Sequence, residues 1–211
     1  MRKILLMTTG LAWLALTGAA SAVTVTVKEG PEDPQYFAST PVGESNFSVG
    51  TTTWSLVSGT ADTESGSVQG QFAAPLGMGD TTYMSVFGGG TEMASFATPQ
   101  TSISIYWGSI DPGNTFVTIN GFTLSGAMLA SMGDATADGS HTSPTSNELV
   151  TISGLGAFSS ATFSSTSNSF EFALGASGVP EASTWVMMTL GFAGLGYAAF
   201  RRNTKGRVLA I

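Results

Sequence analysis

The sequence predicts an all-β domain, a β-sandwich of jelly-roll type, between an N-terminal signal peptide and one C-terminal transmembrane helix. Three observations lead to this prediction. Short segments alternate apolar residues with Ser and Thr, the period of a half-buried strand. Gly, Ser, Asp and Asn separate these segments, as turns between strands require. The chain shows no amphipathic helical pattern beyond one possible turn at Ala127–Met132.

The predicted strands begin directly after the signal peptide. Val23–Lys28 alternates strictly, and in Thr101–Trp107 the side chains of Ile103, Ile105 and Trp107 are expected to share one face. Asn120-Gly121 separates two alternating runs, which is typical of a type I′ hairpin turn. The expected set, in chain order, is 23–28, 51–57, 67–73, 81–87, 101–107, 115–119, 122–125, 148–153, 161–165 and 169–174.

The charge distribution separates the two chain ends from the domain between them. Residues 23–178 contain 13 acidic residues and one basic residue, Lys28, a net charge of −12. A nucleic-acid-binding surface needs cations to neutralise phosphates, so this class of function is excluded. The absence of cysteine excludes disulfides, thiol nucleophiles and Cys-ligated metal centres.

The N-terminal end has the three parts of an export signal. A basic start, Met1–Lys3, precedes an apolar run, Ile4–Thr17, that is too short for a comfortable membrane span. The small residues Ala20 and Ala22 then form the small-x-small pattern of a cleavage site. We therefore expect export by the Sec machinery and signal peptidase cleavage after Ala22, with an uncleaved N-terminal anchor as the alternative.

The C-terminal end is organised as a membrane anchor. Ala182–Phe200 is uncharged, mostly apolar and long enough to cross a bilayer, with Trp185 at an interfacial position. The basic cluster that follows is expected to stay in the cytoplasm under the positive-inside rule. This cluster consists of Arg201, Arg202, Lys205 and Arg207. An ordinary tail anchor that is never processed remains an alternative.

The order of these C-terminal features resembles a known sorting signal. A short motif, the apolar stretch with Gly191, Gly194 and Gly196, and then Arg201-Arg202 are similar to the PEP-CTERM signal of exported bacterial proteins. The motif consists of Val179, Pro180, Glu181, Ala182, Ser183, Thr184 and Trp185. Ala182 stands where the family usually has Pro, a common variant. The resemblance implies recognition by an exosortase, a transpeptidase-like membrane protease, and transfer to the surface or extracellular matrix of a Gram-negative bacterium.

The predicted boundaries follow from these assignments. The signal peptide spans residues 1–22 and the exported β-sandwich domain spans 23–178. The sorting signal spans 179–207, with the transmembrane helix at about 182–200. Residues 208–211 form the cytoplasmic end.

Two further segments resemble a pattern found in PEP-CTERM passengers. The first lies within Thr91–Phe116 and includes Ala94–Gln100, Ile105–Asp111 and Asn114-Thr115-Phe116. The second is Asn168-Ser-Phe-Glu-Phe172, which is similar to their closing strand. The resemblance implies a shared exported β-sandwich and carries no catalytic residue to this chain.

Few residues suggest chemistry. His141 lies in a loop by composition and is interpreted as a solvated residue rather than as part of a triad with serine and aspartate. Calcium, the one candidate cofactor, has oxygen ligands available in two acidic groups. The candidate ligands are Asp134, Asp138, Glu29, Glu32 and Asp33. Asp111 and Asn114 are interpreted as turn caps.

Aromatic residues are candidates for stacking on sugar rings. Because Tyr106 and Trp107 are adjacent in a predicted strand, they are expected to face opposite ways, with Trp107 in the core and Tyr106 exposed as a possible sugar contact. Trp54 is a third candidate. The Ser- and Thr-rich stretch Ser159–Ser169 is either glycosylated or ordinary strand and turn.

These observations predict an exported cell-surface or extracellular-matrix protein, cleaved by an exosortase, with a structural or polysaccharide-associated role in biofilm and no enzymatic activity. Its expected partners are the exosortase, signal peptidase and Sec machinery, the inner membrane and exopolysaccharide, but not nucleic acid. A calcium-dependent carbohydrate-binding module and a secreted glycan hydrolase are the alternatives. The hydrolase would need a pair of carboxyl groups that the sequence alone does not identify.

Overall fold

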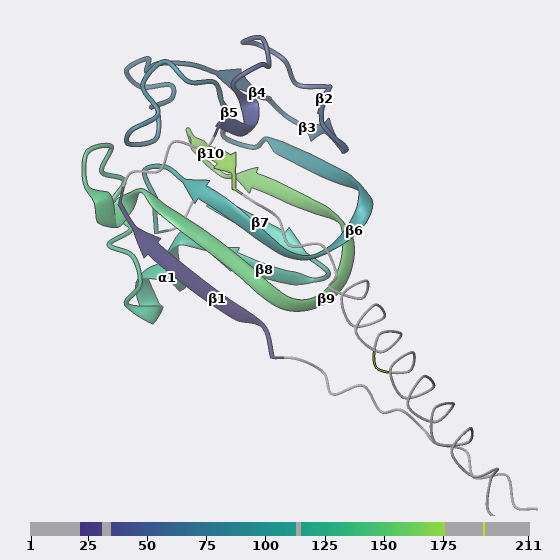
Figure 1. The fold of residues 1–211 in the computed structure, drawn as a ribbon. Helices are drawn as coiled ribbons and strands as arrows, with labels where there is room; N and C mark the ends of the chain where they lie inside the picture. The colour runs from purple at the N-terminus through teal and green to yellow at the C-terminus, as the bar shows by residue number, and fades with distance from the viewer. Residues whose placement is uncertain (1–21, 31–34, 113–114, 176–191, 193–211) are drawn as a thin grey trace, which may run out of the picture.

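A computed structural model describes residues 22–30, 35–112, 115–175 and 192 (Figure 1). Several predictions therefore lie outside the described residues. They are the signal peptide before Ala22, the candidate ligands Glu32 and Asp33, the cap Asn114, the sorting motif 179–185, the span 182–200 except Phe192, and the basic cluster. In the part of the chain that is described, every helix is too short or too polar to traverse a bilayer.

The described residues form an all-β fold, which confirms the predicted class. Ten strands join one continuous sheet, and all of their pairings are antiparallel. The strands are β1 (Thr24–Glu29), β2 (Phe47–Val49), β3 (Thr52–Ser58), β4 (Ala61–Glu64), β5 (Tyr83–Val86), β6 (Thr91–Trp107), β7 (Thr115–Ile119), β8 (Phe122–Ser125), β9 (Glu148–Ser165) and β10 (Phe170–Leu174). The helices are η1 (Gln35–Phe37), α1 (Gly126–Met132) and η2 (Pro144–Ser146).

The two longest strands, β6 and β9, pair with each other and divide the sheet into two layers. In the first layer the order is β4, β5, β10, the end of β6, the start of β9 and β1. In the second layer the order is β2, β3, the start of β6, the end of β9, β7 and β8. Figure 1 shows β6 and β9 curving together from one layer into the other.

The curve lies where the register of β6 and β9 shifts. Ser95 pairs with Ser160, Gln100 with Phe158 and Ser102 with Ser153, so each strand has extra residues on one side of the bend. On β9 the extra residues include Gly154 (φ 78°), where an added Cβ would lie 2.2 Å from the carbonyl oxygen of Ala22. The Asn120 amide donates hydrogen bonds to the carbonyl oxygens of residues 155 and 157 and so ties the β7–β8 turn to the bend.

Aromatic rings fill the space between the layers. Phe163 of the second layer stacks on Phe172 of the first, with ring centroids 4.3 Å apart. Trp54 lies 6.0 Å from Phe172, and Trp107 lies 4.7 Å from Phe170. All of these side chains are fully buried. Burial of apolar surface is therefore the main source of stability, in a domain with few ion pairs available.

The predicted strands agree with the structure in most places and differ from it in several. The segments 101–107, 148–153 and 161–165 are parts of the two long strands. The predicted strand 67–73 is wrong, because this segment is a loop with a single bridge between Val68 and Phe72. The sequence reading missed β2 and β4, which are short edge strands, and it missed residues 91–100, the first part of β6. The type I′ turn is supported by positive φ at Asn120 (48°) and Gly121 (79°).

Three carboxyl groups are almost completely buried. Burial raises the pKa of Glu92 to about 8, against a smaller lowering by the backbone N–H of Ser55. Burial raises the pKa of Glu148 to about 7, with further contributions from the charges of Glu29 and Asp134. Burial also raises the pKa of Glu171 to about 7. Between pH 4.5 and about 7, these three carboxyl groups are therefore largely protonated in the folded domain and largely ionised in the unfolded chain.

We expect the folded chain to become more stable as the pH falls from about 8.5 to about 5.5, because a raised folded-state pKa gives stability that is lost as the pH rises through it. The measurement is the melting temperature of the full-length protein in detergent micelles across this range. A melting temperature that is flat or that rises with pH would contradict the burial of these carboxyl groups.

The Glu92→Met variant isolates the contribution of Glu92 to the pH dependence of stability. Because an apolar side chain of similar length has no ionisation cost in this place, we expect a gain of about 1–3 kcal/mol in the free energy of unfolding near pH 8 and a flatter pH dependence. Glu44→Gln, at an exposed carboxylate, is the matched control and should leave the slope unchanged.

Candidate functional site

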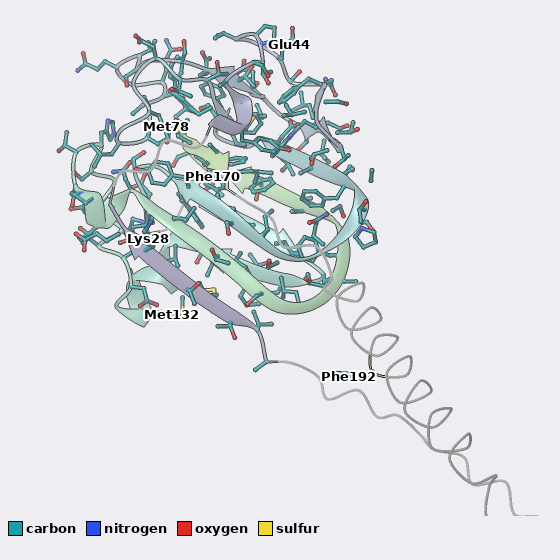
Figure 2. All side chains as sticks on the ribbon, in the orientation of Figure 1. Lys28, Glu44, Met78, Met132, Phe170 and Phe192 are labelled. Atoms are coloured by element: carbon teal, nitrogen blue, oxygen red, sulfur yellow. The ribbon has the colours of Figure 1, made fainter. Side chains whose placement is uncertain are left out.

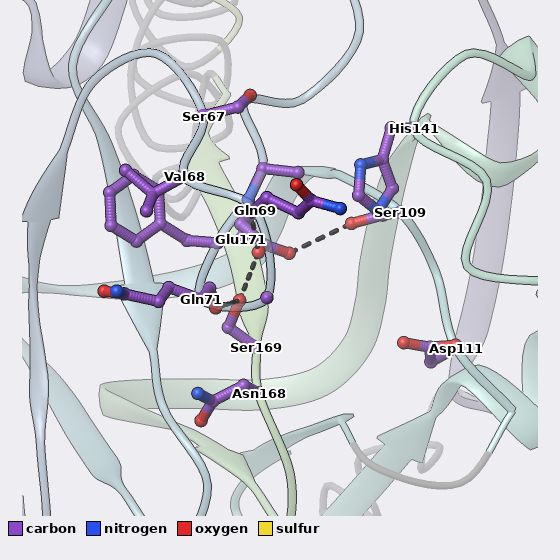
Figure 3. A pocket seen from close by; sticks show the side chains of 13 residues that line it. Ser67, Val68, Gln69, Gln71, Ser109, Asp111, His141, Asn168, Ser169 and Glu171 are labelled. Carbon is purple, nitrogen blue, oxygen red and sulfur yellow. Dashed lines mark hydrogen bonds between the residues drawn. The ribbon is translucent and has the colours of Figure 1, made fainter.

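A pocket of about 490 Å³ opens beside the start of β10 (Figure 3). This volume is within the range of about 300–1,000 Å³ that is usual for small-molecule sites. Four parts of the chain form it: a covering loop of residues 67–73, the segment after β6, the loop that carries His141, and the start of β10 with the residues before it. The lining residues are Ser67, Val68, Gln69, Gly70, Gln71, Phe72, Ala73, Ser109, Asp111, His141, Asn168, Ser169 and Glu171.

Glu171 lies at the centre of the pocket wall. In β10 its neighbours Phe170 and Phe172 face the core, so strand alternation turns Glu171 to the outer face of the first layer. Glu171 is nonetheless 2% exposed, because residues 67–73 cover that face.

Neutral groups hold the Glu171 carboxylate. Its Oε1 accepts hydrogen bonds from the Ala73 N–H, at 2.9 Å, and from the Ser169 hydroxyl, and its Oε2 accepts from the Ser109 hydroxyl at 3.0 Å. Figure 3 shows Glu171 between the two serines. Burial raises the pKa of Glu171 to about 7, although these donors favour the ionised form. The group therefore exists in both protonation states near neutral pH.

Asn147 fixes three segments around the pocket. Its Oδ1 accepts hydrogen bonds from the N–H groups of Leu76 (3.0 Å) and Ser109 (3.1 Å). Its Nδ2 donates to the carbonyl oxygens of Ser140 (2.8 Å) and Ser143 (3.0 Å). Because Asn147 is fully buried, these bonds have no competition from water. Asn147 thus sets the position of Ser109, whose φ of 41° is left-handed, and of the loop that carries His141.

Asp111 and His141 lie across the pocket from Gln71 (Figure 3). Asp111 packs closely against Gly139, where an added Cβ would lie 2.6 Å from Asp111 Oδ1. A larger residue at position 139 would therefore displace this carboxylate. His141 is exposed in its loop, as expected from the composition, and it also lines the pocket.

The lining has the composition of a site for an uncharged or cationic polar molecule. Hydroxyl and amide groups supply both donors and acceptors, and Asp111 and Glu171 add carboxylates. Val68, 43% exposed, and Phe72 add apolar surface. Because no Lys or Arg occurs between Glu29 and Phe200, a phosphate or carboxylate ligand would find no arginine or lysine here.

Tyr106 does not lie on the surface, where the sequence analysis placed it. The prediction of an exposed aromatic is wrong, because Tyr106 is completely buried and its hydroxyl donates to the Leu76 carbonyl at 2.6 Å. Tyr106 and Trp107 do face opposite ways, but the segment around Leu76 covers the outer face as well. Trp107 is in the core, as predicted, and Trp54 is buried there too.

The acidic candidates are placed in two locations. Asp138 accepts hydrogen bonds from the Ser146 hydroxyl (2.5 Å) and the Ser140 N–H (3.0 Å), and these bonds lower its pKa. Glu29 and Asp134 instead lie near enough to Glu148 to raise its pKa. Among the described residues, no three His, Asp or Glu side chains form a group that could hold a metal ion.

Sequence reasoning missed Glu171, Ser109, Ser169 and Asn147. A signal for Glu171 was present, since it is the one charged residue in an otherwise apolar strand. The pocket also joins the two segments that resemble the passenger pattern: Ser109 and Asp111 come from the first, and Asn168, Ser169 and Glu171 from the second.

Comparisons with protein-family models, with curated proteins and with solved structures find no match for this chain.

The Asn147→Ala variant tests how the pocket is built. Removing this amide leaves buried N–H and C=O groups without partners, so we expect a loss of at least about 2 kcal/mol in the free energy of unfolding. Backbone amides of Leu76 and Ser109 should exchange with solvent faster. Asn46→Ala, at an exposed asparagine whose Oδ1 accepts from the Leu56 N–H, is the control and should cost less than about 1 kcal/mol, because water can replace this bond. Equal effects of the two variants would show that Asn147 does not organise the site.

Proposed function

We propose that this chain is an exported surface or matrix protein of a Gram-negative bacterium, sorted by an exosortase, whose β-domain holds extracellular polysaccharide. The observation that carries the polysaccharide part is the pocket lined by hydroxyls, amides and two carboxylates, with exposed apolar surface at Val68. Sugars need this combination of many hydrogen-bonding groups and a few apolar contacts for their ring faces. The role is structural and adhesive rather than enzymatic.

The export and sorting part rests on the two chain ends. The order of basic start, apolar run and small residues supports Sec export, and the order of motif 179–185, apolar stretch and basic cluster supports PEP-CTERM sorting. The antiparallel pairing in two layers supports a β-sandwich of jelly-roll type as the exported architecture. The convergence of both passenger-like segments on one pocket supports a common binding role for such domains.

Fractionation of cells tests the sorting proposal. In cells that contain an exosortase, we expect the domain at the surface or in the medium, and in an exosortase deletion we expect it to stay in the inner membrane. A variant with Pro180→Ala and Glu181→Ala should behave like the deletion. Equal release into the medium from all three strains would contradict sorting by an exosortase.

Binding to purified matrix polysaccharide tests the second part of the proposal. We expect the full-length protein, in a detergent without a sugar head group, to be retained by the polysaccharide, and retention to be the same with and without EDTA. Loss of retention in EDTA would instead support the calcium-dependent carbohydrate-binding module, and absence of retention in both conditions would contradict a polysaccharide role.

A secreted glycan hydrolase remains the second candidate, because of one observation. Glu171, with a pKa of about 7, and Asp111 lie in the same pocket, and a carboxyl group that holds a proton near neutral pH is suited to act as a general acid. Such an enzyme would release reducing ends from the polysaccharide, and Glu171→Gln would abolish the release. No release over a long incubation would leave the binding role.

A further inference from the structure

The pocket combines negative charge with an absence of Lys and Arg, and His141 is the one basic side chain among its lining residues. Asp111 and Glu171 both line it, and the remaining polar groups are hydroxyls and amides apart from His141. The domain around it carries 13 acidic residues and one basic residue. Charges of one sign that line a concave site concentrate counter-ions of the opposite sign there.

The covering loop and the polar wall give two different kinds of contact. Val68 and Phe72 offer apolar surface to the face of a ring, and Val68 is 43% exposed. The Ser109 and Ser169 hydroxyls are already engaged with Glu171, whereas Gln69 extends from an exposed position on the loop. A ligand that enters here therefore meets apolar surface on one side and carboxylates on the other.

We propose that the pocket selects an amino sugar: a hydroxyl-rich ring that carries a protonated primary amine, as in a de-N-acetylated glycan. The ammonium group pairs with the Asp111 carboxylate, and the ring packs against the covering loop. Anionic sugars are rejected, because the Asp111 carboxylate faces them and Lys and Arg are absent between Glu29 and Phe200. This proposal deepens the polysaccharide role above and rests on it.

Glu171, in the pocket wall, adds to the preference for an amino sugar. Its carboxyl is held by neutral donors only and has a pKa of about 7, so a nearby ammonium group favours its ionised form. A neutral sugar brings no such gain. The Asp111 carboxylate therefore distinguishes an amine from an acetamide at one ring position, and Glu171 adds to the distinction where it is ionised.

The experiment measures the affinity of the full-length protein in a zwitterionic detergent at about pH 6, where the ligand amine is protonated. The probes are the β-1,4-linked tetramers of glucosamine, N-acetylglucosamine and glucose. We expect the glucosamine tetramer to bind at least about tenfold more tightly than the other two, and its affinity to fall as salt is added.

Two pocket variants locate the effect. Asp111→Asn keeps the size and turn-forming capacity of the side chain, and we expect it to weaken the glucosamine tetramer about tenfold while leaving the neutral tetramers unchanged. Gln69→Lys places a cation on the exposed loop and should remove the preference for the amine without any buried change. Melting temperatures of both variants report whether the fold is intact.

Glu44→Gln is the matched control for overall charge. Glu44 is exposed and lies at the end of the molecule away from the core residue Phe170 (Figure 2), so we expect less than a twofold effect. An equal loss in Asp111→Asn and Glu44→Gln would overturn the pocket as the source of selectivity. Equal affinity for all three tetramers would overturn the amine preference and leave polysaccharide binding in place. Binding of none of them, together with no retention on matrix polysaccharide, would overturn the proposed function itself.

Discussion

The pairing of β6 with β9 is the constraint on which the rest of the structure depends. Because the same two strands form the middle of both layers, one set of backbone hydrogen bonds fixes how the layers lie on each other. The register shifts between Ser95 and Ser102 turn both strands together, so the aromatic rings of one layer meet those of the other. Every other strand attaches to this pair directly or through one or two neighbours.

The pocket follows from the same arrangement. β10 lies beside the end of β6, so Glu171 comes next to the segment that carries Ser109 and Asp111. Residues 67–73 then cover a carboxylate that would otherwise face water. Because the domain has one basic residue, the buried Glu171 carboxyl is held by neutral donors. These donors are the hydroxyls of Ser109 and Ser169 and the N–H of Ala73. Asn147 likewise supplies hydrogen-bond partners to backbone groups of three loops.

The sequence predicts the local features of this fold well, because they depend on neighbours along the chain. Alternation identified most strands, and Asn120-Gly121 identified a hairpin turn whose φ values agree. The errors occur where a loop packs over the outer face of the sheet. Alternation does not distinguish a face open to water from one covered by a loop, so residues 67–73 and Tyr106 were misplaced. Strand β9 was predicted as two segments and only the second part of β6 was predicted, and Gly154 and Pro99, which lie in the missing parts, are typical of strand ends as well as of bends.

The candidate site was harder to predict than the fold. Asp111 and His141 were noticed for their residue types, whereas Glu171 and Asn147 matter because of what the fold brings against them. No local pattern indicates that residues 67–73 will meet residues 109–111 and 168–171. The nearly cation-free composition of residues 23–178 was the one global signal, and the pocket lining likewise contains no Lys or Arg.

The pocket is built around the buried carboxyl of Glu171, which only neutral groups hold. A carbon-13 NMR titration of the Glu171 side chain in the full-length protein tests it most directly. The structure predicts a midpoint at about 7, because burial disfavours the charged form. A midpoint at the ordinary glutamate value of 4.5 would show that water reaches the carboxylate freely, and would contradict both the cover by residues 67–73 and the selectivity derived from it.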